Sequence, residues 1–240
     1  MRMYRFADFN VDLRSRFDYL PKLCKDYETD ADKADFTVCV SNEEIENERK
    51  GSLKKYTNGY LESVCTYRKL CLALPKHGAM LLHGAVVSVQ GRGIVFVARS
   101  GVGKSTHTAL WKQILGDELT VVNGDKPIIR FFGGKPFAYG TPWAGKEGMQ
   151  TNIRVELTDI CFIERSAFNE TVKISDPAEY ADRIMAQLLI PSDSESLIKT
   201  MEMADRLMSV CNLWQVKCTP DIAAARAAYD AIFGLKGRES

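Results

Sequence analysis

The chain has 240 residues, of which 45% are hydrophobic and 26% charged, values that are typical of a folded globular protein and exclude a disordered one. Lysine and arginine number 32, aspartate and glutamate 31, and a net charge of +1 argues against a basic nucleic-acid-binding face. No stretch approaches the roughly 20 apolar residues of a membrane span, and residues 1–8 lack the apolar core of a signal peptide. We therefore expect a cytoplasmic protein that binds neither nucleic acid nor membrane.

The number and spacing of the cysteines also agree with a cytoplasmic protein. They number seven, and no two stand in a C-x-x-C pair. The three histidines do not lie at metal-ligand spacing from them, so the sequence offers no zinc site. We expect the cysteines to be small buried hydrophobic residues.

Residues 1–75 are predicted to form a small α/β lobe. Apolar and polar residues alternate over 3–13, which predicts a half-buried strand, and a second strand is predicted over 36–40. Residues 41–50 mix both charge signs and fit a solvated turn or helix. Helical spacing of apolar residues begins at about Gly59 and ends before Pro75.

The remaining chain alternates strands, glycine turns and helices, which favours an α/β fold. Strands are predicted over residues 80–89, 94–97, 119–122, 127–132, 136–139 and 157–163. Helices are predicted over residues 106–115, 177–190, 195–210 and 220–233. Thr219 is the expected N-cap of the last helix, with Pro220 at its first position.

The strongest functional signal is the segment Ala98–Ser105, which reads Ala-Arg-Ser-Gly-Val-Gly-Lys-Ser. It fits the Walker A pattern in its [A/G]-x4-G-K-[S/T] form, between an apolar strand and a helix. Glycines let the backbone curl around a phosphate, and the following helix directs its positive end at the same group. An ordinary glycine turn has no need of a lysine immediately before the helix, so we predict a nucleotide site.

Lys104 would contact the β- and γ-phosphates, and Ser105 would ligate Mg²⁺, which makes ATP and Mg²⁺ the expected cofactors. The predicted nucleotide-binding residues are Ser100, Gly101, Val102, Gly103, Lys104, Ser105 and Thr106. The N-K-x-D element of guanine-specific GTPases is not matched, because Asn123–Lys126 carries similar letters in the wrong order and too soon after the loop.

Two further residues accompany this loop. The strand over 119–122 leads into Asn-Gly-Asp125, where P-loop enzymes place a carboxylate that holds Mg²⁺ or its waters. The alternative is that Asp125 only caps a turn. His83 precedes the strand that leads toward the loop, and a single histidine in an apolar run is more often a core residue.

Taken together, His83-Gly84, the Walker A segment and Asp125 resemble the catalytic domain of the HPr kinase/phosphorylase family. In that family a His-Gly pair precedes the P-loop and an Asp-Asp pair follows it. The same fold group includes ATP-dependent phosphoenolpyruvate carboxykinase. Short HPr-kinase-like proteins also show stretches similar to Thr141–Glu147 and Ile160–Arg165. The resemblance covers about residues 78–235 and is sharp only from 81 to 165.

This resemblance implies an α/β fold with a P-loop catalytic domain of the phosphoenolpyruvate carboxykinase/HPr kinase type over residues 76–240. It implies an ATP-dependent kinase that transfers the γ-phosphate to a serine-type hydroxyl of a peptide, protein or small metabolite. Asp125, His83 and Lys104 would be catalytic, and Ser105 and Asp125 would hold the metal. The related bifunctional kinases assemble as rings, so a homo-oligomer is among the expected states.

One departure from the family pattern concerns the acids. Gly124 stands where the first aspartate of the pair is expected, so one carboxylate is missing. Glu147, Glu156 and Glu164 are candidates for a second carboxylate, and the sequence does not place them. The longer C-terminal signature of the bifunctional family is not found, so phosphorylase activity is not expected.

The segment 141–152 is rich in turn-forming residues and suits a lid or an acceptor site, or else a plain surface loop with Trp143 packed on the core. Lys146, Asn152 and Arg154 are the candidate substrate residues. Arg154 and Arg165 would neutralise phosphate charge or serve as ordinary strand-end ion-pair partners, and for Arg165 we favour the second interpretation.

Two functional hypotheses follow from these residues. The first is the Mg²⁺/ATP-dependent hydroxyl kinase. The alternative is a non-catalytic ATP-binding regulatory module, which the glycine at position 124 suggests. The sequence identifies neither the phosphoryl acceptor nor the role of residues 1–75.

Overall fold

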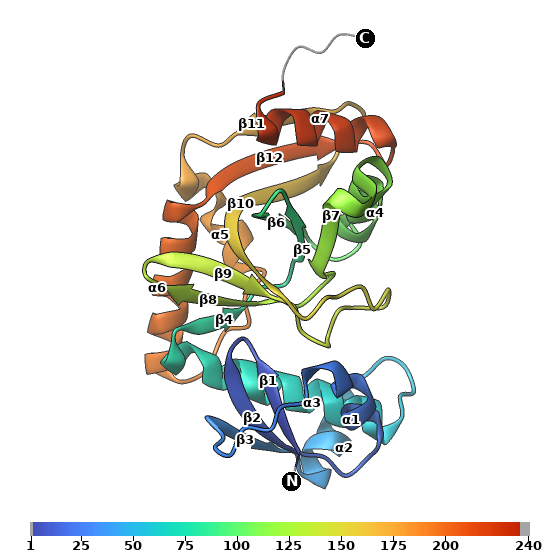
Figure 1. Ribbon diagram of the computed structural model, residues 1–240, viewed down its shortest axis with the longest axis vertical. Coiled ribbons are helices and arrows are strands. Elements are labelled where there is room, and N and C mark those ends of the chain that lie inside the picture. Colours follow the sequence, from blue (N-terminus) through green and yellow to red (C-terminus); the bar gives the residue numbers. More distant parts are fainter. Residues whose placement is uncertain (1, 236–240) are drawn as a thin grey trace.

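The computed structural model describes residues 2–235, which form a mixed α/β protein (Figure 1). The N-terminal elements gather at one end of its longest axis, and the C-terminal helix lies toward the other (Figure 1). A larger sheet occupies the space between them and has helices on both faces. The α/β fold class predicted from the sequence is confirmed at this level.

A three-stranded sheet and three helices make up the N-terminal part. Strand β2 pairs antiparallel with β1 and parallel with β3. The elements are β1 (Met3–Phe6), β2 (Phe9–Arg14), α1 (Tyr19–Leu23), β3 (Phe36–Cys39), α2 (Asn42–Gly51) and α3 (Asn58–Ala73), with 3₁₀ turns at Lys25–Tyr27 and Leu74–His77.

The single strand predicted over residues 3–13 is wrong, because the chain reverses within it. Ala7 and Asp8 have φ angles of 50° and 61°, which form a tight two-residue connection of the kind that joins antiparallel strands. Phe6 and Phe9 then stand opposite each other. The apolar alternation continues on both sides of the turn, and Ala-Asp is a weak turn signal, so the pattern concealed the hairpin.

Helices account for the polar segment after β3. Residues 42–51 form α2, in which the Ser41 hydroxyl accepts a hydrogen bond from Glu44 N, while the Glu44 carboxylate accepts one from Ser41 N. This reciprocal capping box satisfies two backbone donors at the helix start. Helix α3 matches the predicted helix and is followed by a 3₁₀ turn that contains Pro75.

The rest of the described chain holds nine strands and four α-helices. Short 3₁₀ turns occur at Gly116–Glu118 and Pro177–Tyr180. The elements are β4 (Ala79–Leu81), β5 (Ala85–Val89), β6 (Arg92–Val97), α4 (Lys104–Leu115), β7 (Leu119–Asn123), β8 (Ile128–Phe132), β9 (Lys135–Tyr139), β10 (Arg154–Arg165), β11 (Glu170–Lys173), α5 (Ala181–Met185), α6 (Ser194–Val210), β12 (Asn212–Cys218) and α7 (Ile222–Phe233).

The nine strands form one sheet in the order β4-β8-β9-β10-β6-β5-β7, with β12 paired to β10 and β11 to β12. Strand β10 is central to it, because its first residues pair antiparallel with β9 and its later residues pair parallel with both β6 and β12. Strand β5 is antiparallel to β6 and to β7. The carboxyl ends of β6, β7, β10 and β12 therefore lie at the same edge of the sheet.

Strand β6 shows how the sheet is buried on both faces. Val95 and Val97 belong to the cluster packed against α5 and α6, whereas Ile94 and Phe96 belong to the cluster packed against α4 and α7. Successive side chains of a strand point to opposite faces, so a strand covered on both sides consists almost entirely of apolar residues. This burial on both faces explains the apolar run from which the strand was predicted.

A third apolar cluster joins the N-terminal part to the larger sheet. It contains Tyr4, Phe6 and Leu70 from the N-terminal part together with Ile128 and Trp143 from the sheet and its following segment. The lobe boundary near residue 75 stays a prediction, and the two parts share this core.

Several predicted elements differ from those observed. The strand predicted over 80–89 is interrupted between β4 and β5, and the helix predicted over 177–190 is a 3₁₀ turn followed by the short α5. Strand β12 was not predicted, because its buried residues Leu213, Val216 and Cys218 do not alternate strictly. The N-cap of α7 is Asp221, which accepts a hydrogen bond from Ala224 N.

None of the helices formed by residues 2–235 has the length and apolar character that crossing a membrane would require.

Candidate functional site

The predicted site residues from three separate segments meet at one edge of the larger sheet. Strand β6 ends just before Ala98, and β7 ends two residues before Asp125. Strand β5 runs antiparallel to both, so its preceding residue His83 lies at the same edge. The interruption between β4 and β5 is what brings His83 there, and the His83 N–H donates to Gln187 O at 2.8 Å.

The segment Ala98–Ser105, which we call the candidate P-loop, connects β6 to α4. Gly101 and Gly103 have φ angles of 79° and 131°, a region that favours glycine. No atom lies within 4 Å of where a Cβ would stand on either residue, so the loop borders open space. Helix α4 begins without a side-chain cap on its first turn, which leaves backbone N–H groups available to an anion.

Lys104 is folded over this loop and is only 8% exposed. Its Nζ donates to Ala98 O at 3.1 Å and lies 3.3 Å from Nε2 of His83. Burial lowers the pKa of Lys104, which the charge of Asp125 partly offsets. The ammonium group is therefore held at the loop, where it has few solvent contacts to lose when it meets a phosphate.

Asp125 lies between two basic side chains. Its Oδ1 is 3.1 Å from Nε2 of His83, and its other oxygen is paired with the ammonium group of Lys126. Burial by itself would raise the pKa of Asp125, but the hydrogen bonds and charges of His83 and Lys126 outweigh it and lower the pKa well below its ordinary value. The carboxylate is thus ionised at neutral pH.

The positions of these groups define where the protons lie. Nε2 of His83 faces both Asp125 and Lys104, and one nitrogen cannot donate to the first while accepting from the second. We assign the proton to Nε2, so that His83 donates to Asp125 and Lys104 donates to Ala98 O. Lys104 can then leave its carbonyl partner for a phosphate without disturbing the contact between His83 and Asp125.

The turn that carries Asp125 is fixed by two residues whose role the sequence did not reveal. Asn123 is fully buried, and its Oδ1 accepts hydrogen bonds from the backbone N–H groups of Asp125 and Lys126 at 2.9 and 2.6 Å. Tyr67 of α3 donates from its hydroxyl to Lys126 O at 2.6 Å. The N-terminal part therefore braces the turn directly.

Gly124 is enclosed by the segment that follows β9. A Cβ at this position would lie 3.2 Å from the carbonyl oxygens of both Ala144 and Met149. Its N–H donates to Met149 O at 2.9 Å. These contacts are tighter than those a Cβ ordinarily makes, so a second acid at position 124 would require this segment to shift by a few tenths of an ångström.

The segment 141–152 combines both interpretations considered from the sequence. Trp143 is buried and stacked on Tyr67 with ring centroids 4.1 Å apart, as expected of a core residue. Gly145 lies against Asp125, since its Cβ would stand 3.0 Å from that of the aspartate. Residues 145–148 are exposed. Residues 141–144 are thus core, and Gly145, the next residue, lies over Asp125.

The three candidate substrate residues are not brought together. Lys146 is exposed and follows Gly145, the residue that lies against Asp125. Asn152 donates from its side chain to Asp26 O at 2.8 Å. Arg154 lies at the start of β10, where it contacts Asp8 and the Tyr139 hydroxyl. Asn152 and Arg154 thus attach the larger sheet to the N-terminal part.

Arg165 has a role that differs from the strand-end ion pair we favoured. Its Nε donates to Val102 O at 3.0 Å, and a second guanidinium nitrogen donates to Gly101 O. Both acceptors belong to the candidate P-loop, so Arg165 holds the loop from the end of β10. In the sequence, the only indication that Arg165 contacts the loop was its position at the end of a predicted strand.

The three acids considered as a second carboxylate are dispersed. Glu156 pairs with Lys135, and Glu147 lies in the exposed segment that covers Asp125. Glu164 pairs with Arg183 and accepts a hydrogen bond from Gln215. Among them, only Glu164 lines a cavity together with residues of the candidate P-loop.

The donor set at the loop fits a magnesium ion shared with a phosphate. Ser105 is the second residue of α4, and Asp125 is ionised at the same edge of the sheet. Within residues 2–235, no three His, Cys, Asp or Glu side chains converge to form a protein-only metal site. A Mg²⁺ ion usually keeps several waters and combines one or two protein ligands with phosphate oxygens, which is what this set offers.

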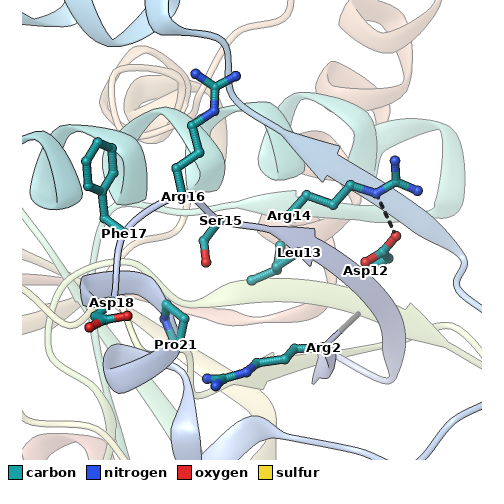
Figure 2. Close-up of a pocket in the computed structure, with 9 residues that line it drawn as sticks. All are labelled: Arg2, Asp12, Leu13, Arg14, Ser15, Arg16, Phe17, Asp18 and Pro21. Atoms are coloured by element: carbon teal, nitrogen blue, oxygen red, sulfur yellow. Dashed lines mark hydrogen bonds and ion pairs between the residues drawn. The ribbon is translucent and has the colours of Figure 1, made fainter.

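Two cavities flank the candidate P-loop, one on each face of the sheet. The cavity beside α4 has a volume of about 410 Å³, and the cavity beside α5 has a volume of about 460 Å³. A third cavity of about 510 Å³ lies in the N-terminal part, between Arg2, the segment 12–18 and Pro21, where Figure 2 shows Arg14 bonded to Asp12. This third cavity contains none of the predicted site residues.

No family model matches the sequence, and no curated protein matches it. One similar solved structure is the Hpr(Ser) kinase/phosphatase from Coxiella burnetii, which is 9% identical over 66% of this chain and 99% of that chain, with a TM-score of 0.36. At this identity and TM-score, the likeness identifies neither a family nor a function for this chain.

Proposed function

We propose that the protein is a Mg²⁺/ATP-dependent phosphotransferase that acts on a hydroxyl group of a peptide, protein or small metabolite. The observation that carries this proposal is the meeting of Lys104, His83 and Asp125 at the open side of the candidate P-loop. A glycine loop, a helix start and a lysine suit the binding of a phosphate chain, and an ionised carboxylate beside them suits its metal.

In this proposal the loop residues bind and neutralise phosphate oxygens. The N–H groups of the loop glycines and of the first turn of α4 would donate to the phosphates, whereas the Val102 N–H already donates to Arg99 O at 3.2 Å. Lys104 would exchange its bond to Ala98 O for one to a phosphate oxygen. Arg165 would keep the loop in its conformation through the Val102 and Gly101 carbonyls. Ser105 and Asp125 would hold Mg²⁺, which when bound neutralises the charge that develops on the phosphates.

The lowered pKa of Asp125 favours one of its two candidate roles. A general base works best when its pKa lies near the working pH, and burial opposed by His83 and Lys126 leaves the pKa of Asp125 far below that. We therefore assign Asp125 mainly to metal binding and to orienting the acceptor hydroxyl. Phosphoryl transfer depends mostly on positioning and charge neutralisation, so a weak base is sufficient. His83 would keep the carboxylate oriented.

The acceptor would approach through the cavity beside α5. This cavity touches Ala98, Arg99 and Val102 of the candidate P-loop and is also lined by Glu164, Arg183 and Gln187. The Oε1 atom of Gln187 is buried and has no partner among the described residues, and a hydroxyl or amide donor that reached it would satisfy it. Charged and amide groups at this place support a polar acceptor.

The test is ³¹P NMR of the protein with Mg²⁺/ATP and a panel of hydroxyl compounds: free serine, homoserine, simple sugars and serine-containing peptides. The proposal predicts a new phosphate-ester resonance with wild-type protein that is missing with Asp125→Asn. The expected loss for this variant is at least about 100-fold. Equal ester formation by Asp125→Asn and wild-type protein would contradict the assigned role.

The alternative is a non-catalytic ATP-binding module, favoured by the closed surroundings of Gly124, which leave Asp125 without an adjacent second acid. It predicts that ATP resonances broaden in the presence of the wild-type protein but not of Lys104→Ala, with no ester from any acceptor. Recovery of a phosphorylated product eliminates this alternative.

A further inference from the structure

The cavity beside α4 differs in character from the cavity beside α5. Its walls include the apolar side chains of Val102, Leu110, Ile163 and Pro220. Its lining contains no Asp, Glu or Lys, and the guanidinium group of its single arginine, Arg165, is bonded to the loop carbonyls. The cavity beside α5, in contrast, is lined by Arg99, Glu164, Asp182 and Arg183. An uncharged occupant therefore suits the cavity beside α4 better than the cavity beside α5.

The position of this cavity connects it to the candidate P-loop. Val102, Gly103 and Thr106 line it, and these residues form the end of the loop and the first turn of α4. A group bound there would be continuous with a phosphate chain bound by the N–H groups of the same turn. Its volume of about 410 Å³ lies within the ~300–1,000 Å³ that small-molecule sites span.

One polar side chain in this lining has an unused hydrogen-bond donor. His107 is 2% exposed, and its Nε2 accepts a hydrogen bond from Trp111 Nε1 at 3.0 Å. Because Nε2 is the acceptor, the ring proton resides on Nδ1, and this buried Nδ1 has no partner among the described residues.

A buried donor without a partner is costly and is rarely found without a reason. Phe96 packs edge-on against the imidazole with centroids 4.9 Å apart, and Trp111 fixes the other nitrogen. The ring is thus held in one orientation by two aromatic residues. Nothing in the packing of the described residues uses its remaining N–H.

We propose that this cavity binds the purine nucleoside half of the nucleotide, and that His107 Nδ1–H donates to an acceptor nitrogen or oxygen of that half. The inference rests on the proposed function, because the phosphates of the same molecule would occupy the candidate P-loop. The apolar walls would cover the flat base, while His107 supplies a directional contact. An acceptor atom of the ligand would also give the buried Nδ1–H the hydrogen-bond partner that it lacks.

The test compares two ligands that share phosphates but differ in the nucleoside. Calorimetric titrations of Mg²⁺/ATP and of Mg²⁺/tripolyphosphate are carried out on the wild-type protein and its variants. For the wild-type protein we expect ATP to bind at least about 10-fold more tightly than tripolyphosphate, since only ATP fills the cavity.

Two variants of His107 isolate the proposed contact. His107→Asn retains an N–H donor near the position of Nδ1, whereas His107→Leu removes it, and both leave the Trp111 N–H without its partner. We expect ATP to bind about 10-fold more weakly to His107→Leu than to His107→Asn. Tripolyphosphate should bind equally to both. Equal ATP affinity of the two variants would contradict the role of His107.

A second pair of variants tests the cavity without altering its buried histidine. Leu110→Trp fills the cavity from α4, whereas Gln113→Trp adds the same ring to an exposed position of that helix. Only Leu110→Trp should weaken ATP binding, again with tripolyphosphate binding unchanged. If ATP affinity is unaffected by Leu110→Trp, the nucleoside binds elsewhere and the inference is wrong.

The same titrations separate this inference from the proposed function. If tripolyphosphate binds the wild-type protein as tightly as ATP does, and Lys104→Ala abolishes its binding, the nucleoside cavity is wrong but the phosphate site is retained. Failure of both ligands to bind the wild-type protein would overturn the proposed function and this inference with it.

Discussion

Nε2 of His83 lies 3.1 Å from Oδ1 of Asp125, although the two residues are separated by 42 positions in the chain. The contact exists because the chain is interrupted between β4 and β5 and because β7 ends at the same edge of the sheet. Together with Lys126, His83 keeps the pKa of Asp125 below its ordinary value in spite of burial. The site is thus preorganised with one ionised acid beside a buried lysine.

A first prediction concerns the pH dependence of stability. A carboxyl group whose pKa is lowered by folding stabilises the native state above its ordinary pKa of 3.8, and this contribution is lost as the pH falls toward the lowered value. The difference in unfolding free energy between wild-type protein and Asp125→Asn should therefore shrink below about pH 4, by at most about 1.4 kcal/mol per pH unit. Urea denaturation between pH 7 and pH 3 measures this difference.

The matched control for this series is Asp117→Asn, which alters an exposed aspartate in the turn after α4. It should show no comparable change with pH. If the difference in unfolding free energy between wild-type protein and Asp125→Asn stays constant from pH 7 to pH 3, the described surroundings of Asp125 are contradicted.

Lys104→Met should make the nucleotide-free protein more stable. Burial disfavours the ammonium group of Lys104, as its lowered pKa indicates, and methionine removes the charge while it keeps most of the side-chain volume. We expect a gain on the order of 1 kcal/mol in the free energy of unfolding, measured by chemical denaturation. On the same helix, Lys112 is exposed and donates to Gly116 O and Leu119 O, so Lys112→Met loses these bonds without removing a buried charge and should be destabilising instead. A large loss of stability in Lys104→Met would disprove this account of the lysine.

Gly124→Asp restores the residue that the family pattern leads one to expect, and we predict that it impairs the protein. The new side chain would meet the carbonyl oxygens of Ala144 and Met149, so Gly124→Ala should already cost about 1–3 kcal/mol and Gly124→Asp more. Gly51→Ala, at a position with no atom within 4 Å of the added Cβ, is the control and should be tolerated. Thermal denaturation measures these effects. If Gly124→Asp has the melting temperature of the wild-type protein, the segment 141–152 moves to accommodate the new side chain and the prediction is wrong.

Arg165→Lys should weaken ATP binding although the charge is retained. The guanidinium group donates to two loop carbonyls at once, and a lysine ammonium cannot reproduce that geometry. We expect a loss of affinity of about 10-fold, because a looser loop must be ordered when the phosphates bind. Arg226→Lys, on the exposed side of α7, should leave ATP affinity unchanged. Calorimetric titration provides the measurement, and equal affinity of Arg165→Lys and wild-type protein would exclude this function of Arg165.

The sequence predicted those parts of the molecule that are determined locally. The strand before Ala98 and the helix after Gly103 follow from an apolar run, glycines and a helical apolar spacing. Strand β12 was missed because its position is determined by parallel pairing with β10, a strand that is distant in sequence. The hairpin of β1 and β2 was missed because the same alternation continues through its turn.

The same distinction holds for the candidate site. The Walker A segment was proposed from its residue pattern and Asp125 from its place at the end of a strand, but the residues that position them come from far along the chain. Tyr67 reaches Lys126 O from α3, and Arg165 reaches the loop carbonyls from the end of β10. These contacts depend on how α3 and β10 pack, which no short motif encodes. The closed surroundings of Gly124 likewise appear only in the folded chain.

The central claim is that the candidate P-loop binds the phosphates of ATP through Lys104, beside an Asp125 that serves the subsequent chemistry. Titration of Mg²⁺/ATP into wild-type protein, Lys104→Met and Asp125→Asn tests it most directly. We predict saturable binding to the wild-type protein, a loss of at least about 100-fold in Lys104→Met, and a loss of no more than about 10-fold in Asp125→Asn. Binding of ATP to Lys104→Met with the affinity of the wild-type protein would contradict the claim.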